Sequence, residues 1–392
     1  MPEEHLTTES EPETPKPPRV ALIASRKTVC DYPLYLKYLL VGLADESVPV
    51  MLICHPACNV DSIVPPTVEV VRHPAVDIPL LDRYNRELLL GRLVTFRPDL
   101  LHCLCETNAS LARWLSGNLN LRYLLNLNSI VTRFHHVSIS LTRCKAVVVP
   151  AKTIADHFAS THPKLADRVR QINIGTFVES ATACFSHPER LPGIVIAHSL
   201  DTQAALDNIF GALHRLAIDN YQFIVALIGA GPTERHLRKK LSSLGLSRIV
   251  TIVGRLPGID SALSSTDIFI VPRPSFSFNS LLLSAMGAGC AVAACTGGVD
   301  DLIIDGKTAL VFNPDEQLSI YNCLRRFFDA PELARQIAAN AQQHLRQNHH
   351  VSDMVGSTLR LYRQSAHPGQ PPSPQPAPDD GRQTAEDGRT VL

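Results

Sequence analysis

The chain has 392 residues, of which 45% are apolar and 19% are charged, a composition typical of a globular protein with about two domains. Its 37 basic and 37 acidic residues balance, so there is no basic excess to indicate a nucleic-acid partner. The longest apolar runs, such as 221–228, are far shorter than the roughly 20 residues of a membrane span. With an acidic start that lacks a signal peptide's apolar core, they predict a cytoplasmic protein without a transmembrane segment and leave peripheral membrane contact open.

The 10 cysteines are scattered along the chain, and their spacing does not form a disulfide framework. The two segments closest to a metal site are Cys54-His55-Pro56-Ala57-Cys58 and His102-Cys103-Leu104-Cys105. A structural zinc site needs a second spaced cysteine pair or a histidine pair one helical turn apart, and the sequence has neither. We therefore expect buried or loop thiols, no bound metal and no other cofactor.

Both ends of the chain are poor in apolar residues. Residues 1–17 are rich in Glu, Thr and Pro, and residues 365–392 are rich in Pro, Gly, Asp and Gln. Neither segment can bury enough surface to offset the entropy of ordering, so both are predicted to be disordered tails. Between them, periodic apolar residues are interrupted near 179–192. This break divides the chain into a predicted N-terminal domain over 18–178 and a C-terminal domain over 193–348.

In the N-terminal half, short apolar runs alternate with helical patterns. Within 80–96, the residues Leu81, Tyr84 and Leu88 recur at steps of three and four, which predicts a helix, and a second helix is predicted over 32–44. Strands are predicted at 20–25, 48–55, 68–73, 100–105, 123–128, 146–151 and 169–175.

The C-terminal half repeats this plan. Between its first two strands, Leu206, Ile209 and Leu213 mark one apolar helix face. Strands are predicted at 193–200, 221–229, 249–254, 267–272, 290–295 and 308–312. Nearly continuous apolar strands that alternate with helices are typical of parallel sheets covered on both faces. We therefore predict an α/β chain with two Rossmann-like domains facing a central cleft, where ligands bind beyond the carboxyl ends of the strands.

Two motifs of the C-terminal half suit a phosphate-bearing ligand. Gly229-Ala230-Gly231-Pro232 lies between a strand and the predicted helix 233–244, and such glycines serve either a tight turn or a close ligand approach. After the strand 267–272, Asn279 is a good N-cap for a helix over 280–288 that begins at Ser280. The start of this helix is either an ordinary capped end or an anion site for a diphosphate.

Taken in order, these motifs resemble the retaining GT-B glycosyltransferases of family four. The resemblance covers roughly 19–364 and is most specific over 224–312, where Gly-x-Gly-Pro is followed by Val253-Gly254-Arg255-Leu256, the aspartate-led strand at 267, an Ala-Met-x-x-Gly segment at 285–289 and Gly297-Gly298. It implies a C-terminal domain that binds a nucleotide-sugar donor and an N-terminal domain that binds the acceptor, without a metal. It also implies that the last helix, over 349–364, crosses back to the first domain.

The charged residues of the family are missing at four positions. The two glutamates that contact the donor sugar and the ribose are replaced by Phe276 and Ser284, and the Arg and Lys that clamp the diphosphate are replaced by Ser199 and Ala204. The family's early Gly-Gly loop reads Ser25-Arg26-Lys27-Thr28, and Asn126-Leu127-Asn128 stands where a histidine often follows the fifth strand. Candidates for replacement charge are Arg26, Lys27, Arg255, Arg273 and His198, each of which is otherwise a surface or packing residue.

The leading hypothesis is a glycosyltransferase that moves a sugar from a nucleotide diphosphate to an unidentified acceptor, with the retaining mechanism that the resemblance implies. The alternative is a catalytically inactive GT-B pseudoenzyme that binds a glycan or a protein, which the loss of all four charged positions favours. No catalytic residue is assigned. The predicted donor-binding residues are His198, Ser199, Gly229, Gly231, Arg255, Arg273, Asn279, Ser280 and Ser284.

Overall fold

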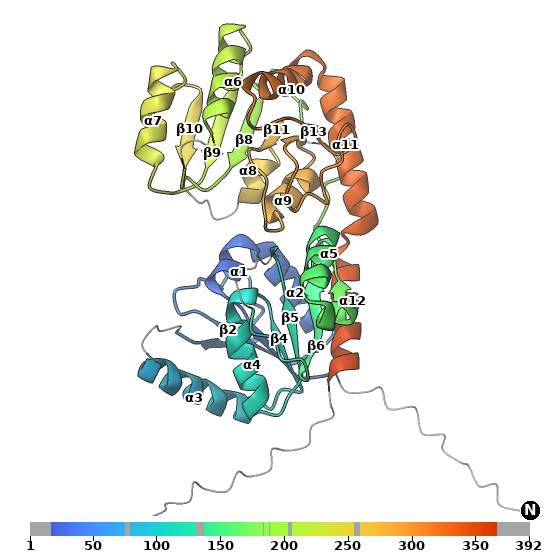
Figure 1. Cartoon of the computed structure of the whole chain (residues 1–392). Coiled ribbons are helices and arrows are strands. Elements are labelled where there is room, and N and C mark those ends of the chain that lie inside the picture. The colour runs from blue at the N-terminus through green and yellow to red at the C-terminus, as the bar shows by residue number, and fades with distance from the viewer. Residues whose placement is uncertain are drawn as a thin grey trace, which may run out of the picture.

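The computed structural model describes residues 17–74, 79–130, 137–182, 184–187, 189–202, 206–254 and 259–366. Within these ranges the chain forms two α/β domains, one from each half of the sequence (Figure 1). Each domain is a parallel sheet covered by helices. Of the two predicted tails, only residue 17 and residues 365–366 lie within the described part.

The N-terminal domain is built on a seven-stranded parallel sheet in the order β3-β2-β1-β4-β5-β6-β7. Its strands are β1 (Val20–Ile23), β2 (Val50–Cys54), β3 (Glu69–Arg72), β4 (Leu100–Cys103), β5 (Tyr123–Asn126), β6 (Cys144–Val149) and β7 (Val169–Gln171). Its helices are α1 (Arg26–Asp31), α2 (Pro33–Asp45), α3 (Pro79–Phe96), η1 (Glu106–Asn108), α4 (Ala109–Asn118), α5 (Lys152–Thr161) and η2 (Pro163–Arg168).

The C-terminal domain has a six-stranded parallel sheet in the order β10-β9-β8-β11-β12-β13. Its strands are β8 (Gly193–Ala197), β9 (Ile224–Ile228), β10 (Val250–Val253), β11 (Ile268–Val271), β12 (Ala291–Ala294) and β13 (Leu310–Val311). Its helices are α6 (Asp207–Ile218), α7 (Glu234–Ser243), α8 (Ile259–Leu263), α9 (Ser280–Ala288), α10 (Gln317–Asp329) and α11 (Pro331–Asn348), followed by the last helix, α12 (Val351–Ser365).

The apolar runs explain both sheets. Every residue of β1, β4, β11 and β12 is buried, as expected for strands covered by helices on both faces. Each sheet reverses its strand order beside its first strand, between β1 and β4 and between β8 and β11, which is the doubly wound arrangement of Rossmann domains. The predicted fold of two parallel-sheet domains is therefore confirmed, and every predicted strand segment contains or overlaps a strand.

The last helix packs on the N-terminal domain, although it follows the C-terminal domain in sequence. In Figure 1, α11 runs down from the C-terminal domain, and α12, which follows it, packs against α2 of the N-terminal domain. A Cβ atom added to Gly42 of α2 would come within 2.5 Å of the Val355 side chain, so these two helices are in close contact. The crossing that the family resemblance implies is therefore present.

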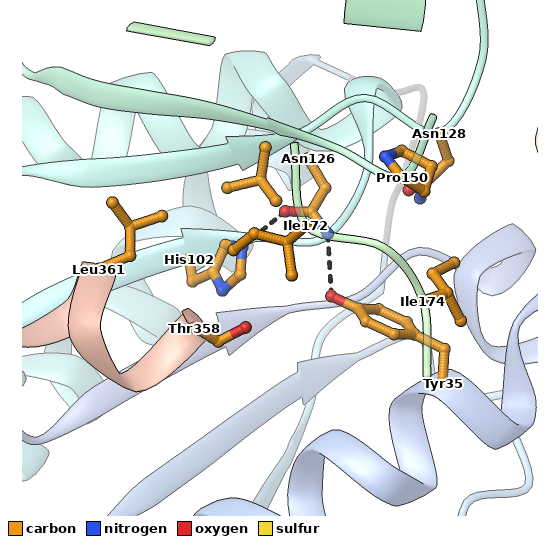
Figure 2. Close-up of a pocket in the computed structure, with 10 residues that line it drawn as sticks. Tyr35, His102, Asn126, Asn128, Pro150, Ile172, Ile174, Thr358 and Leu361 are labelled. Carbon is orange, nitrogen blue, oxygen red and sulfur yellow. Dashed lines mark hydrogen bonds between the residues drawn. The ribbon is translucent and has the colours of Figure 1, made fainter. Parts of the chain in front are cut away.

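A buried polar cluster joins α12 to this sheet, around a small cavity (Figure 2). The Tyr362 hydroxyl donates to Nδ1 of His102 (2.7 Å), and Nε2 of His102 donates to Oδ1 of Asn126 (2.7 Å). Nδ2 of Asn126 then donates to the Tyr35 hydroxyl of α2 (2.9 Å). Burial lowers the pKa of His102 to about 4, so the imidazole is neutral at neutral pH. His102 and Asn126 thus connect β4, β5, α2 and α12 inside the domain.

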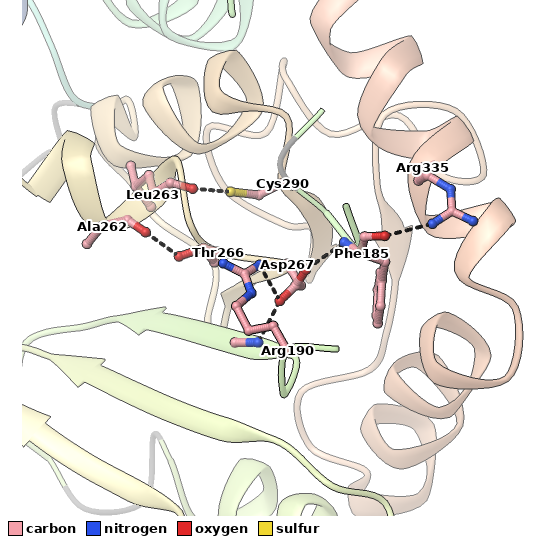
Figure 3. A network of polar contacts seen from close by, with 9 residues as sticks. Phe185, Arg190, Ala262, Leu263, Thr266, Asp267, Cys290 and Arg335 are labelled. Atoms are coloured by element: carbon pink, nitrogen blue, oxygen red, sulfur yellow. Dashed lines mark hydrogen bonds and ion pairs between the residues drawn. The ribbon is translucent and has the colours of Figure 1, made fainter. Parts of the chain in front are cut away.

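A second polar cluster holds the segment between the domains (Figure 3). Asp267, directly before β11, is 2% exposed, and its carboxylate accepts hydrogen bonds from the backbone N–H of Phe185 (2.5 Å) and Gly193 (2.7 Å). Arg190 donates to both of its oxygens, at 3.2 and 3.1 Å. Arg335 of α11 binds the Phe185 carbonyl oxygen (2.9 Å). The aspartate that begins the motif therefore serves to attach the interdomain segment.

Candidate functional site

The strand order of the C-terminal sheet reverses between β8 and β11, and ligands of doubly wound sheets bind at the carboxyl ends of the strands beside such a reversal. His198 and Ser199 follow β8 directly, and Arg273 follows β11 after one intervening proline. The neighbouring strand β9 leads into Gly229, and α9 begins after the loop that follows β11. The described candidate residues therefore belong to loops and a helix at one edge of the sheet. Arg255 and Ala204 lie outside the described residues.

The two glycines after β9 make room for the backbone of the loop after β8. A Cβ atom on Gly229 would lie 2.0 Å from the carbonyl oxygen of His198, and one on Gly231 would lie 2.3 Å from that of Leu200. Thr233 fixes the same contact, because its hydroxyl and its N–H both donate to the Leu200 carbonyl, at 2.6 and 3.1 Å. The contact between the two loops accounts for both glycines, which favours the turn interpretation of the motif.

Replacing Gly229 with alanine should lower the free energy of unfolding by about 3 kcal/mol, because the added methyl group forces the loop after β8 to move. Urea unfolding at neutral pH measures this change. Gly254→Ala is the matched control, since a Cβ atom there meets nothing within 4 Å. Equal stability of the two variants would contradict the packing role of Gly229.

The two residues that directly follow β8 are His198 and Ser199, and neither supplies the guanidinium that the family resemblance places at position 199. Nδ1 of the half-buried His198 donates to the carbonyl oxygen of the adjacent Ser199 (2.5 Å), which leaves Nε2 as an acceptor in the neutral ring. The Ser199 side chain is exposed. The first clamp position therefore offers a hydroxyl group and a neighbouring imidazole in place of a guanidinium.

Arg273 is already engaged by a carboxylate. Its Nη1 lies 2.6 Å from Oδ1 of Asp315, in the loop before α10, and its side chain is 27% exposed whereas that of Asp315 is 77% exposed. Arg273 lies where the prediction placed it, at the carboxyl end of β11, but a diphosphate has to compete with Asp315 for its charge. Sequence reasoning missed this partner because Asp315 follows 42 residues later and shows no motif of its own.

The start of α9 has the predicted cap. The Asn279 side chain accepts a hydrogen bond from the Leu282 backbone N–H (3.0 Å), which confirms Asn279 as the N-cap. The hydroxyl of Ser280 donates to the carbonyl oxygen of Asp31 in the N-terminal domain. Ser284 is half-buried one turn further along the helix. The helix start therefore faces the other domain, with Ser280 in direct contact with it.

The loop before α9 is bonded to the N-terminal domain. Ser277 forms a short antiparallel bridge with Ser129, and the two flanking hydrogen bonds run from the Ile130 N–H to the Phe276 carbonyl (2.7 Å) and from the Phe278 N–H to the Asn128 carbonyl (2.9 Å). The Tyr32 hydroxyl donates to the Phe278 carbonyl at 3.0 Å. The carboxyl ends of the two sheets therefore meet at this loop. The polar residues that follow β5 are the only sequence signal for this contact.

The Gly-Gly motif supports the same loop from its own domain. The Val299 N–H donates to the carbonyl oxygen of Ser275 (2.7 Å), and a Cβ atom on Gly298 would come within 2.2 Å of that oxygen. Asp301 of the same segment accepts a hydrogen bond from the backbone N–H of Thr153, in the first turn of α5 (3.1 Å). The motif therefore fixes the loop between the domains and forms a second contact with the first domain.

Phe276 occupies the position at which the family resemblance places the sugar-contacting glutamate. Its side chain is 61% exposed, whereas its carbonyl group is held by the interdomain bridge. The backbone at this position is therefore fixed, but the side chain supplies no carboxylate.

The N-terminal side of the site is formed by residues after β1 and β4. The Ser25 hydroxyl caps α1 by accepting from the Thr28 N–H (3.0 Å), and Arg26 and Lys27 are exposed beside it. A hydrogen bond from Cys103 is the main cause that lowers the pKa of the Cys105 thiol to about 6, although Cys105 is buried. All 10 cysteines are free thiols, and within the described ranges no group of three or more His, Cys, Asp or Glu residues could hold a metal ion.

The sequence of this chain is similar to those of known glycosyltransferases. Residues 183–344 match the family model of glycosyl transferases group 1. Sulfoquinovosyl transferase SQD2 of Arabidopsis thaliana is 23% identical over 265 residues, which cover 58% of this chain and 49% of that protein, so the match spans about half of the relative's length.

Solved structures match over nearly the whole chain. A glycosyltransferase from Rickettsia africae superposes with a TM-score of 0.73 at 14% identity and covers 89% of this chain and 98% of its own. Anabaena Alr3699/HepE in complex with UDP and glucose superposes with a TM-score of 0.72 at 14% identity, over 88% of this chain and 99% of its own. The chain therefore has the GT-B fold, and the part of it that matches the glycosyl transferases of group 1 is its C-terminal domain.

Proposed function

We propose that the protein transfers a sugar from a nucleotide diphosphate to an acceptor, with retention of configuration at the anomeric carbon and without a metal. The observation that carries this proposal is the group 1 match over the domain whose strand reversal, capped helix and loop after β11 form the candidate donor site. The UDP and glucose bound to the HepE neighbour support a nucleotide-sugar donor. Free thiols are typical of reducing compartments, which supports a cytoplasmic location.

The charge of a diphosphate is the main energetic demand on this site. Each hydrogen bond to a charged group contributes about 1.5–3 kcal/mol, so loss of the clamp's two side chains removes roughly 3–6 kcal/mol. The first amides of a helix have no intrahelical partners, and the helix end offers about half a unit of positive charge. In this proposal, α9 supplies the amides, and Arg273 supplies the cation after it exchanges Asp315 for the ligand.

A catalytically inactive binding protein is the second candidate function. Two observations favour it: the side chain at position 276 is a phenylalanine whose backbone is bonded to the other domain, and Arg273 is paired with Asp315. Under this alternative, the loop before α9 serves to hold the domains together, and the molecule presents a GT-B surface to a glycan or a protein.

Calorimetric titration of the full chain with UDP, GDP and ADP tests both candidates. We expect one nucleotide to bind, Arg273→Ala to weaken it about tenfold, and Asp315→Asn to strengthen it, because that change removes the carboxylate that competes with the diphosphate for Arg273. Arg248→Ala is the matched control, because Arg248 is an exposed arginine in the loop between α7 and β10. This loop leads into the amino end of β10, whereas the candidate site lies at the carboxyl ends of the strands. Titration with EDTA or with magnesium ions checks that binding needs no metal.

The outcomes separate the two functions. Binding followed by release of sugar or its transfer to an acceptor supports the enzyme. If the wild-type protein ignores all three nucleotides at millimolar concentration, and Ser199→Arg with Ala204→Lys does not restore binding, the transferase proposal fails. Binding gained only in the restored double variant points to a site that has lost its function.

A further inference from the structure

A carboxylate of the N-terminal domain lies beside the loop that precedes α9. Glu106 begins η1 directly after Cys105, at the carboxyl end of β4, and Ser129 follows β5, the neighbouring strand in the sheet. The Ser129 hydroxyl donates to Oε1 of Glu106 at 2.8 Å. Ser129 also forms the backbone bridge to Ser277, so this one serine connects Glu106 to the C-terminal domain.

The second oxygen of Glu106 has no hydrogen-bond partner in the described part of the chain. Oε2 is buried, and among the described residues no donor forms a hydrogen bond with it and no basic side chain forms an ion pair with Glu106. A buried oxygen of a carboxylate costs free energy when it is unpaired, and folded proteins pair nearly all such groups. An exception at the interface of the two domains therefore points to a partner other than the described residues.

The position of Glu106 relative to Phe276 indicates what that partner is. Phe276 replaces the family's sugar-contacting glutamate, and its carbonyl group is bonded to Ile130, the residue after Ser129. A negative charge next to the donor site repels a diphosphate but accepts strong hydrogen bonds from hydroxyl groups. Glu106 therefore suits the sugar end of a nucleotide-sugar and not its phosphate end.

We infer that Glu106, oriented by Ser129, binds a hydroxyl group of the donor sugar and thereby replaces, from the N-terminal domain, the carboxylate that position 276 lacks. The inference rests on the proposed function, since it assigns a residue to the sugar of that donor. With the bridge between Ser129 and Ser277 formed, Oε2 is shielded, so the hydroxyl group reaches it when the loop 275–278 moves away. Ser129 is a positioning residue, and Glu106 is a binding residue.

The test compares each nucleotide with its sugar esters. Calorimetry on the full chain uses UDP, GDP and ADP, each alone and as its glucose, galactose, mannose or N-acetylglucosamine ester. Whichever nucleotide binds, we expect one ester to bind more tightly than the free nucleotide. Glu106→Ala should weaken that ester about tenfold and leave the free nucleotide unchanged. Glu106→Gln should recover part of the loss, because an amide oxygen still accepts a hydrogen bond, and Ser129→Ala should show a smaller loss of the same kind.

Glu69→Ala is the matched control, because Glu69 is an exposed carboxylate on the edge strand β3. Thermal unfolding and the retained affinity for the free nucleotide show that each variant is folded. Equal losses for nucleotide and ester, or no ester that binds more tightly in the wild type, would overturn the inference while leaving the nucleotide site intact. Absence of any nucleotide binding in the wild type is a different result, and it counts against the transferase itself.

Discussion

Asp267→Ala should lower the free energy of unfolding by about 3–4 kcal/mol, one of the two largest effects that we expect from a single substitution. The carboxylate holds Arg190 and the backbone N–H groups of Phe185 and Gly193, and it is 2% exposed. Breaking a buried charged pair by removing one partner typically costs about 3–5 kcal/mol. The lower part of that range applies here, since the Arg190 side chain is 35% exposed and regains contact with water.

Urea unfolding at pH 7 measures the loss, and Asp201→Ala serves as the control because Asp201 is exposed in the same domain. Asp267→Asn keeps the shape of the side chain and removes its charge. The amide oxygen still accepts a hydrogen bond from one N–H group, but the NH₂ group then faces the remaining N–H donors. We expect it to be nearly as destabilising as alanine. A loss below 1 kcal/mol in Asp267→Ala would show that the interdomain segment is held by other contacts.

His102→Ala should lower the free energy of unfolding by about 3 kcal/mol at pH 8 and also remove part of the protein's acid sensitivity. The substitution leaves a cavity and takes the partners from the Tyr362 hydroxyl and from Oδ1 of Asn126, both buried. A residual cavity and unpaired polar groups each contribute to such losses.

The acid sensitivity follows from the lowered pKa of His102, which burial brings from 6.5 to about 4. Above pH 6.5 the imidazole is neutral in the folded and the unfolded chain, so its contribution to stability is fully present. As the pH falls from 6.5 towards 4, only the unfolded chain binds the proton, and stability is lost. One pH unit is worth about 1.4 kcal/mol, so His102 accounts for roughly 3 kcal/mol over this range.

Urea unfolding between pH 8 and pH 4 should therefore show a shallower pH dependence in His102→Ala than in the wild type. His236→Gln is the control, because His236 is exposed on α7. If both variants lose stability with pH as steeply as the wild type, then the folded chain binds a proton at His102 and the buried cluster is not neutral.

The features of this chain that could be predicted from its sequence are those that depend on residues close together in the sequence. Strands buried on both faces have to be apolar along their whole length, and β1, β4, β11 and β12 are. A helix start needs an acceptor for its free N–H groups, and Asn279 supplies it.

The partners of charged and polar side chains could not be predicted, because they lie far apart in sequence. Arg273 and Asp315 are separated by 42 residues, and His102 and Tyr362 by 260. The glycines after β9 gave two equally reasonable interpretations, since a sequence does not show that the loop after β8 lies against them. The bridge between Ser129 and Ser277 involves two ordinary serines in loops, and only the three-dimensional arrangement brings them together.

The position of α12 has a consequence for the way the chain is made. A protein leaves the ribosome from its first residue to its last, and domains generally fold in that order. Here the hydroxyl group that binds His102 belongs to Tyr362, and Val355 packs against Gly42, so the first domain is completed only by a helix that lies about 350 residues from the start of the chain. Synthesis therefore completes the C-terminal domain before the N-terminal one, and a fragment that stops at residue 178 lacks part of its own core.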